Sequence, residues 1–223
     1  MDPDLLGGAE FSGRLPLFPL PNVVLFPHGL LPLHVFEPRY RALAEAALAG
    51  ERLIGMAVLK PGWEADYQGT PPVHEVLGLG RVIKEERLPD GRFNLLLVGL
   101  ARARVVEEVQ STPFRVARVD VLSDRPAEGE AYERRRRLLR AFYAQKLKEA
   151  TPPGEPAPEL PDDIPLGDLC DLVISGFVTN QEERLVYLGE TDVAARCDRL
   201  MEFFKSITPS AKPRSWPPEP STN

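Results

Sequence analysis

The feature that most constrains the fold is an apolar segment near the start of the chain that prolines interrupt at short intervals. Residues 15–48 read LPLFPLPNVVLFPHGLLPLHVFEPRYRALAEAAL, and they contain Pro16, Pro19, Pro21, Pro27, Pro32 and Pro38. Proline cannot donate a backbone hydrogen bond, so strands tolerate it at edges, at their first residues and at bulges. The first part of the segment therefore predicts short extended pieces: strands at 15–18, 22–26 and 30–36, with turns at 19–22 and 27–29.

The periodicity becomes helical after Pro38. Apolar residues recur at three- and four-residue spacing between Tyr40 and Leu48, and Gly50 follows as a stop signal. This pattern predicts a short amphipathic helix over 39–49, with Pro38 in its first turn.

Extended sequence follows this helix up to about residue 125. Apolar runs predict strands at 52–59, 75–87, 92–99, 102–109 and 114–121, with a break at Gly99 and a bulge in the last strand, where the apolar phase shifts. The sequence LPDGRF at 88–93 is typical of a tight turn, since Pro89 presets its own φ and Gly91 accepts a positive φ. It predicts a β-hairpin with Asp90 and Gly91 at its tip.

The chain becomes helical from residue 129. A long first helix is expected to place one apolar face on Leu138, Leu139, Phe142, Tyr143 and Leu147. Three further helices are expected at 166–177, at 181–188 and after Thr191, a predicted N-cap. Strands followed by helices indicate the α+β class. The expected organisation is a tail (1–13), a β-rich subdomain (14–125), a helical subdomain (126–208, with a proline-rich connector at 151–165) and a proline-rich tail (209–223).

Composition excludes several classes of protein. The net charge of −6 over 223 residues argues against a general nucleic-acid binder. No apolar run is long enough to span a bilayer and the acidic start MDPDLLGGAE is unlike a secretory signal, so a cytoplasmic location is expected. The two cysteines, Cys170 and Cys197, stand on apolar helical positions, which favours buried free thiols over a disulfide or a zinc site.

Several stretches, in order, resemble the N-terminal domain of Lon proteases. They are the opening LPLFPLPNVVLFP…LPLHVFEPRYRAL, then GLGRVIKEERLPDGRFNLLLVGLARARVVEE, and finally LGDLCDLVISGF and QEERLVYLGETDVAARCDRLMEFF, together spanning about residues 14–205. The resemblance implies a PUA-like fold, a curved β-sheet or barrel with a short helix, followed by a helical bundle. It also implies architectural roles for the motif residues Pro19, Pro27, Glu37, Pro38, Arg39, Tyr40, Asp90, Gly91 and Gly99.

The chain lacks the signatures of the other Lon activities. No GxxxxGK[ST] phosphate loop is present, and no stretch resembles the Ser–Lys protease region. The sequence therefore resembles stand-alone Lon N-type proteins, for which we expect neither enzymatic activity nor a cofactor. His28, His34, His74 and Glu75 lack the short spacing of metal ligands, so no metal site is expected.

The loop at 60–72 carries the candidate binding residues. Trp63 and Tyr67 stand there among Gly, Pro and acidic residues, where no core periodicity requires them. Long loops without secondary structure of their own tend to be functional, and large aromatics supply contact area. Trp63 and Tyr67 are thus candidate polypeptide-binding residues. The alternative, that both rings fold back as a cap on the barrel end, stays open.

Two other motifs favour plainer roles. Glu37 precedes a predicted helix, where a carboxylate suits the helix dipole and can pair with Arg39. The arginines of ERRRRLLR (133–140) wrap around a helix and indicate a solvated face paired with acids. The sequence therefore predicts a non-catalytic module that binds unfolded or degron-bearing polypeptides, as an adaptor or chaperone-like factor that works with a protease or chaperone. The alternative is RNA or small-ligand binding through the PUA-like barrel.

Overall fold

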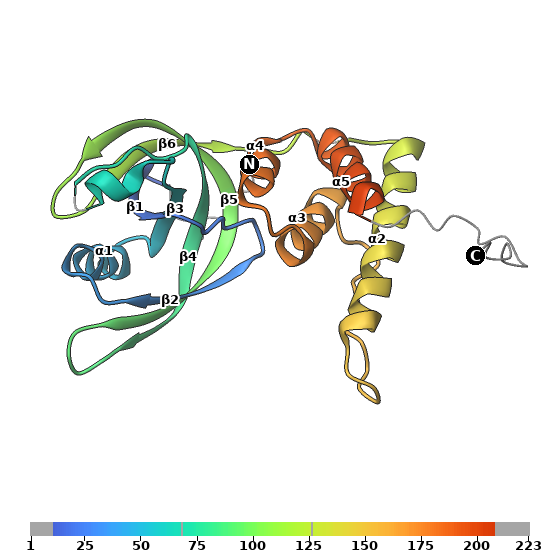
Figure 1. The fold of residues 1–223 in the computed structure, drawn as a ribbon, viewed down its shortest axis with the longest axis horizontal. Coiled ribbons are helices and arrows are strands. Elements are labelled where there is room, and N and C mark those ends of the chain that lie inside the picture. Colours follow the sequence, from blue (N-terminus) through green and yellow to red (C-terminus); the bar gives the residue numbers. More distant parts are fainter. Residues whose placement is uncertain (1–10, 68, 126, 208–223) are drawn as a thin grey trace, which may run out of the picture.

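The structure is a computed structural model that describes residues 11–67, 69–125 and 127–207 (Figure 1). The elements of its first part are β1 (Arg14–Leu20), β2 (Leu30–Val35), α1 (Pro38–Ala49), β3 (Leu53–Val58), the 3₁₀ turn η2 (Trp63–Asp66), β4 (Val76–Arg87), β5 (Phe93–Gln110) and β6 (Val116–Leu122). The helices α2 (Glu130–Ala150), α3 (Leu166–Phe177), α4 (Gln181–Gly189) and α5 (Val193–Ile207) follow. This mixed α+β order confirms the predicted class; the exact division at residue 125 stays a prediction, and 209–223 lies outside the described residues.

The sheet closes on itself. β1 pairs with β3 in parallel, and the antiparallel pairs β3–β4, β4–β5, β5–β6 and β6–β1 complete a ring of strands. The long strand β5 makes this closure possible, because its first half pairs with β2 and its second half with β6. A small closed barrel results, with β2 added at one side.

Several predicted strands differ from the observed ones. The segments 92–99 and 102–109 form one continuous strand, so Gly99 does not end a strand. In the β5–β6 pair the bulges lie in β5, with register shifts between Val105 and Glu107 and between Glu108 and Gln110, whereas β6 alternates between more and less buried residues. The phase shift seen in the sequence is only apparent, because Arg115 and Ala117 take the buried positions before Val119, while Phe114 and Val116 are partly buried.

The predicted strand at 22–26 does not form. Its residues Val24, Leu25 and Phe26 are buried, but they cross over the sheet as irregular chain. Side chains of α4 bond to backbone carbonyls of this segment and of the residue before it: Arg184 Nη2 donates to Val24 O at 3.0 Å, and Gln181 Nε2 donates to Pro21 O at 2.6 Å. Because buried carbonyls need partners, α4 takes the place of a neighbouring strand.

The turn and helix predictions are largely confirmed. Gly91 has φ +81° at the tip between β4 and β5, where Asp90 Oδ1 accepts a hydrogen bond from Arg92 N. Cys170 and Cys197 are buried free thiols. In contrast, Leu138 is 52% exposed and does not join the buried face of α2. Asp192, not Thr191, caps α5, since its Oδ1 accepts from Ala195 N at 3.0 Å.

The helices pack against the barrel through a shared apolar core. Val24, Phe26 and Val58 belong to the same buried cluster as the apolar residues of α3 and α5. α1 instead packs on the other end, where its Tyr40, Leu43 and Ala44 are buried with strand residues. In Figure 1 α1 and η2 therefore lie on the left, opposite α2–α5. That left end carries the candidate site.

Candidate functional site

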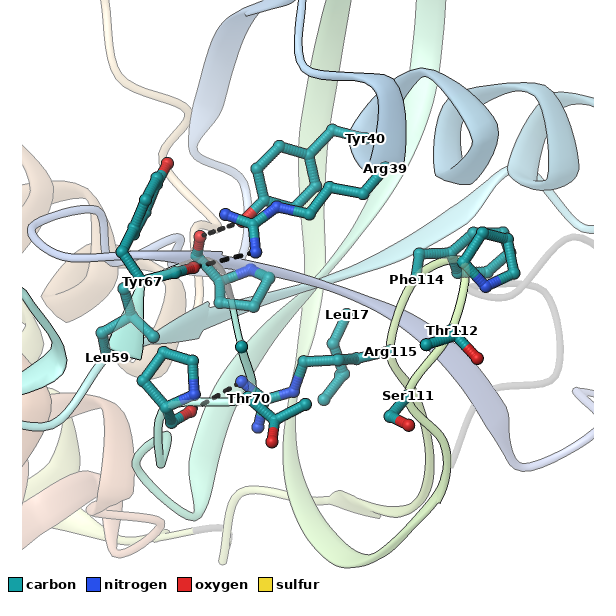
Figure 2. A pocket seen from close by; sticks show the side chains of 14 residues that line it. Leu17, Arg39, Tyr40, Leu59, Tyr67, Thr70, Ser111, Thr112, Phe114 and Arg115 are labelled. Atoms are coloured by element: carbon teal, nitrogen blue, oxygen red, sulfur yellow. Dashed lines mark hydrogen bonds between the residues drawn. The ribbon is translucent and has the colours of Figure 1, made fainter. Parts of the chain in front are cut away.

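A cavity of about 260 Å³ opens at this end of the barrel (Figure 2). Three segments surround it: the first turn of α1, the loop at 60–72 and the connection between β5 and β6. Its lining includes Leu17, Arg39, Tyr40, Tyr67, Phe114 and Arg115, and we call it the loop pocket. The sequence motif at the start of α1 and the candidate loop, distant in the chain, thus meet at one site.

Glu37 connects the helix to the loop. It precedes Pro38 as the N-cap of α1 in an extended conformation, so its carboxylate lies beside the positive end of the helix dipole. Oε1 accepts a hydrogen bond from Tyr67 Oη at 2.6 Å, and Oε2 accepts one from Arg39 Nε at 3.1 Å. The predicted pairing of Glu37 with Arg39 is confirmed, and Tyr67 is a third member of the cluster.

The guanidinium of Arg39 lies between two aromatic rings. Its central carbon is 4.7 Å from the centroid of Tyr40 and 4.8 Å from that of Tyr67, which is cation–π geometry. Nη1 donates to the backbone O of Tyr67 at 2.9 Å. Arg39 therefore binds the loop through both a ring and a carbonyl.

Burial and hydrogen bonding raise the pKa values of Tyr40 and Tyr67. Tyr40 stacks on Phe18 at 4.2 Å, donates to Pro19 O at 3.2 Å, and burial raises its pKa to about 12. The pKa of Tyr67 is also raised, first by its hydrogen bond to Glu37 and then by burial. Both phenols therefore stay neutral, and act as donors, at physiological pH.

Arg115 holds the far end of the same loop. Nη1 donates to Pro71 O at 2.7 Å, while Nε donates to Glu108 Oε2 at 2.8 Å and Nη2 to Glu108 Oε1. With 7% of its surface exposed, this arginine is buried and has a partner for each nitrogen. Two guanidinium groups thus fix the loop by its carbonyls on either side of the pocket, as Figure 2 shows.

The loop has local structure of its own, contrary to the expectation from the sequence. η2 begins after Gly62, whose φ is +88°, and places Trp63 edge-on against Tyr67 with centroids 5.4 Å apart. Both rings are partly buried, and Tyr67 lines the pocket. Tyr67 therefore docks on the barrel, as the cap alternative expected, while a polypeptide-binding role for both residues stays a proposal.

The remaining motif residues lie in strands and turns. Pro19 lies in β1 and lines the pocket, and Pro27 lies in the turn before β2. Asp90 and Gly91 form the hairpin tip, and Gly99 lies within β5, none of them lining the pocket. Arg115 and Glu108 were not predicted, because their pairing depends on the β5–β6 register and leaves no pattern in the sequence.

The histidines do not converge. His28 Nε2 lies 3.3 Å from Asp168 Oδ1, and His34 Nδ1 lies 2.8 Å from Asn94 Oδ1. Within the described ranges, no group of three His, Cys, Asp or Glu residues is arranged to hold a metal ion. In the same part of the chain, no helix has the length and apolarity needed to cross a membrane.

The structure thus defines a small closed β-barrel with a clamped surface loop and four following helices. Residues 14–206 match the family described as the ATP-dependent protease La (LON) substrate-binding domain, and the chain belongs to this family. It is 30% identical over 203 residues to Lon protease 2 of Myxococcus xanthus, covering 90% of this chain and 24% of that protein. The chain spans about a quarter of the length of the curated relatives it matches.

Solved structures support the same fold. A Lon N-terminal domain protein from Xanthomonas campestris has a TM-score of 0.63 at 22% identity, covering 85% of this chain and 98% of that one. The N-terminal domain of a Mycobacterium avium complex Lon protease has a TM-score of 0.62 at 16% identity, covering 87% and 99%. The matched region of the Lon proteases is thus their substrate-binding part alone.

Proposed function

We propose that this chain is a non-catalytic, cytoplasmic module that recognises unfolded or degron-bearing polypeptides, as an adaptor or chaperone-like factor in proteolysis. Membership of the substrate-binding family supports binding of polypeptide. The observation that carries the proposal is the loop pocket, a largely apolar cavity. Hydrogen bonds from Arg39 and Arg115 hold the loop at its edge, so the cavity stays open.

The walls of the pocket suit a polypeptide. Leu17, Leu59 and Phe114 supply apolar surface, and Trp63 stands next to it on the loop. Aromatic and aliphatic anchors in a preformed pocket are typical of binding hot spots. Acidic loop residues such as Glu64 and Asp66 would repel a nucleic-acid backbone, which disfavours the RNA alternative. The closed ring of strands supports our further proposal that the barrel is PUA-like.

Suppression of aggregation tests this function. Purified protein is mixed with a chemically unfolded client, and light scattering is followed over time. Trp63→Ala should weaken protection, because it removes contact area beside the pocket and leaves the Arg39 and Arg115 clamps intact. Leu138→Ala removes an exposed apolar side chain of α2, away from the pocket, and should protect as wild type does. Equal protection by a folded Trp63→Ala variant would place the binding face elsewhere.

A further inference from the structure

A groove lies between α2 and α5, at the end of the molecule opposite the loop pocket. In Figure 1 these two helices lie on the right, while α1 and η2, beside the loop pocket, lie on the left. The groove has a volume of about 650 Å³, and we call it the helix groove. It is lined by residues of both helices, among them Arg134, Arg135 and Leu138 of α2 and Asp198, Met201 and Lys205 of α5. The helix groove and the loop pocket can therefore be occupied at the same time.

Apolar side chains form the floor of the helix groove. Leu138 is 52% exposed there, although its spacing predicted a place on the buried face of α2. Met201 is partly buried against the apolar core of the helices, and Ala131 lies two turns before Leu138 on α2. Exposed apolar surface between polar rims is typical of protein interaction sites. The floor therefore offers contact area to the apolar side chains of a partner.

Ion pairs divide the arginines of α2 into two groups. Three of them are paired, namely Arg135 with Asp198, Arg136 with Glu133, and Arg140 with Asp162. Arg134 and Arg137 are exposed and make no hydrogen bond or ion pair within the described residues. Lys205, on the opposite rim of the groove, makes none there either. Each rim therefore carries a cation that is available to a partner.

The charge of the lining favours an acidic partner. Asp198 accepts hydrogen bonds from Arg135 on both of its oxygens, at 2.7 and 2.6 Å, so its charge is balanced. The open charges of the lining are one acid and two cations: Glu130, Arg134 and Lys205. Arg137 and Glu202, each next to a lining residue in the chain, are exposed and offset each other. The groove is thus positive in a chain whose net charge is −6, and complementary charge favours an acidic partner.

The length of the groove fits a short stretch of helix. Its lining covers about two turns of each helix, 130–138 on α2 and 198–205 on α5, or roughly 10–12 Å. A helix packs between two others through an apolar stripe, whose residues at i, i+4 and i+7 cover two turns. The chain's own segment after α5 does not suit this groove, because prolines recur in its sequence and Lys212 and Arg214 would meet like charges.

We propose that the helix groove binds an acidic amphipathic helix of a partner protein. The apolar stripe of this helix packs on Leu138 and Met201, and acidic side chains on its two flanks pair with Arg134 and Lys205. The inference goes beyond the proposed function, because it assigns a second surface that binds a helical partner instead of the client polypeptide. An adaptor requires such a surface, since it must hold its client and the protein that processes the client together.

Fluorescence anisotropy with a matched pair of labelled peptides tests the proposal. Both are alanine-based helices of about 18 residues with leucine at i, i+4 and i+7, and the residues that flank the leucines are glutamate in one peptide and lysine in the other. Wild-type protein should bind the glutamate peptide at least about tenfold more tightly, and the preference should decrease as the salt concentration rises. The double variant Arg134→Gln, Lys205→Gln should lose most of this preference. Leu138→Ala should weaken binding of the glutamate peptide about fivefold or more, since contact area on the floor is lost.

Matched variants outside the groove should bind as wild type does. They are Arg118→Gln, which removes an exposed arginine of β6, and Val186→Ala, which removes an exposed apolar side chain of α4. Equal binding of the two peptides by wild type, or binding of neither, overturns the proposal and leaves the proposed function standing as long as an unfolded client is protected. Binding of the glutamate peptide without protection of the client gives the reverse result: the proposed function fails and this inference stands.

Methionine methyl NMR locates the site. Met201 lines the groove, and Met56 is fully buried in the barrel, where it serves as an internal control. The glutamate peptide should shift the signal of Met201 and leave that of Met56 unchanged. A preference for the glutamate peptide without a shift at Met201 overturns the assignment to this groove. A shift of Met201 caused by the unfolded client, or by a rise in protein concentration alone, identifies the client or a second copy as the occupant and overturns the proposal too.

Discussion

At the scale of single residues, Tyr67 joins the loop to the barrel. Its hydroxyl donates to Glu37, its carbonyl accepts from Arg39, and its ring covers the same guanidinium. The Glu37–Arg39 pair could be predicted because the two residues are close in sequence. Tyr67 could not, since a contact across 30 residues depends on where the fold places the loop.

Replacing Tyr67 with Phe should lower the free energy of unfolding by about 1–2 kcal/mol. The lost hydrogen bond has a charged acceptor, which makes it stronger than average, and partial exposure reduces its contribution. Urea unfolding measures the change. Tyr143→Phe is the control, because its hydroxyl makes no hydrogen bond within the described residues. A Tyr67→Phe variant as stable as wild type would contradict the role of this bond.

The hydrogen bond from Tyr67 to Glu37 also makes the free energy of unfolding depend on pH. The pKa of Tyr67 is raised in the folded protein, chiefly by the hydrogen bond to Glu37, above its ordinary value of about 10. The folded state therefore favours the neutral phenol, so this stabilisation is complete below about pH 10 and is lost as the pH rises through the folded pKa. The stability gap between wild type and Tyr67→Phe should narrow above about pH 10.

At the scale of secondary structure elements, local chemistry predicted the pieces with strong sequence signals. The helix at 39–49, the strand at 52–59 and the turn at Gly91 all formed within a residue or two of expectation. The strand predicted at 22–26 was wrong, because an apolar run between prolines has the same sequence pattern whether a strand or α4 provides its hydrogen-bond partners. Likewise, Gly99 resembled a strand break because its contact with another segment is not visible in the sequence.

Position 99 requires glycine because the segment that contains Phe26 crosses directly over it. A Cβ at this position would collide with the carbonyl oxygen of Phe26, and one at Gly78 would collide with that of Leu25. Gly99→Ala should therefore destabilise the protein by about 1–3 kcal/mol or more, the usual cost of overpacking. Gly176→Ala in α3 is the matched control, since its Cβ meets nothing within 4 Å, and helix propensity should make it neutral or stabilising. Thermal unfolding compares the two; equal effects would contradict the close approach.

At the scale of the whole molecule, buried charges join the barrel to the helices. Arg102 of β5 donates to Asp171 of α3, and Arg196 of α5 donates to Asp124 in the chain after β6. Arg102, Asp171 and Arg196 are each at most 3% exposed. Burial raises the pKa of Asp171 against the opposing effect of both guanidinium groups. This network could not be predicted from the sequence, because its members are separated by up to 94 residues and come together only when the helices dock.

Removing one charged residue from this network should lower the free energy of unfolding more than removing an acid and an arginine together. Asp171→Leu leaves Arg102 and Arg196 with Asp124 as their shared acid, and breaking a buried pair in this way should cost about 3–5 kcal/mol. Adding Arg102→Met restores the balance, since Arg196 and Asp124 remain paired, so the double variant should recover much of the loss.

Two spectroscopic probes can follow this coupling during urea unfolding. In a Trp216→Phe background, Trp63 is the remaining tryptophan and reports on the barrel, while far-UV circular dichroism reports chiefly on the helices. The two transitions should coincide in the Trp216→Phe parent and separate in Asp171→Leu, with the helices unfolding first because they lose their ionic contact with β5. A double variant no more stable than the single one, or coincident transitions in Asp171→Leu, would show that apolar packing alone couples the two parts.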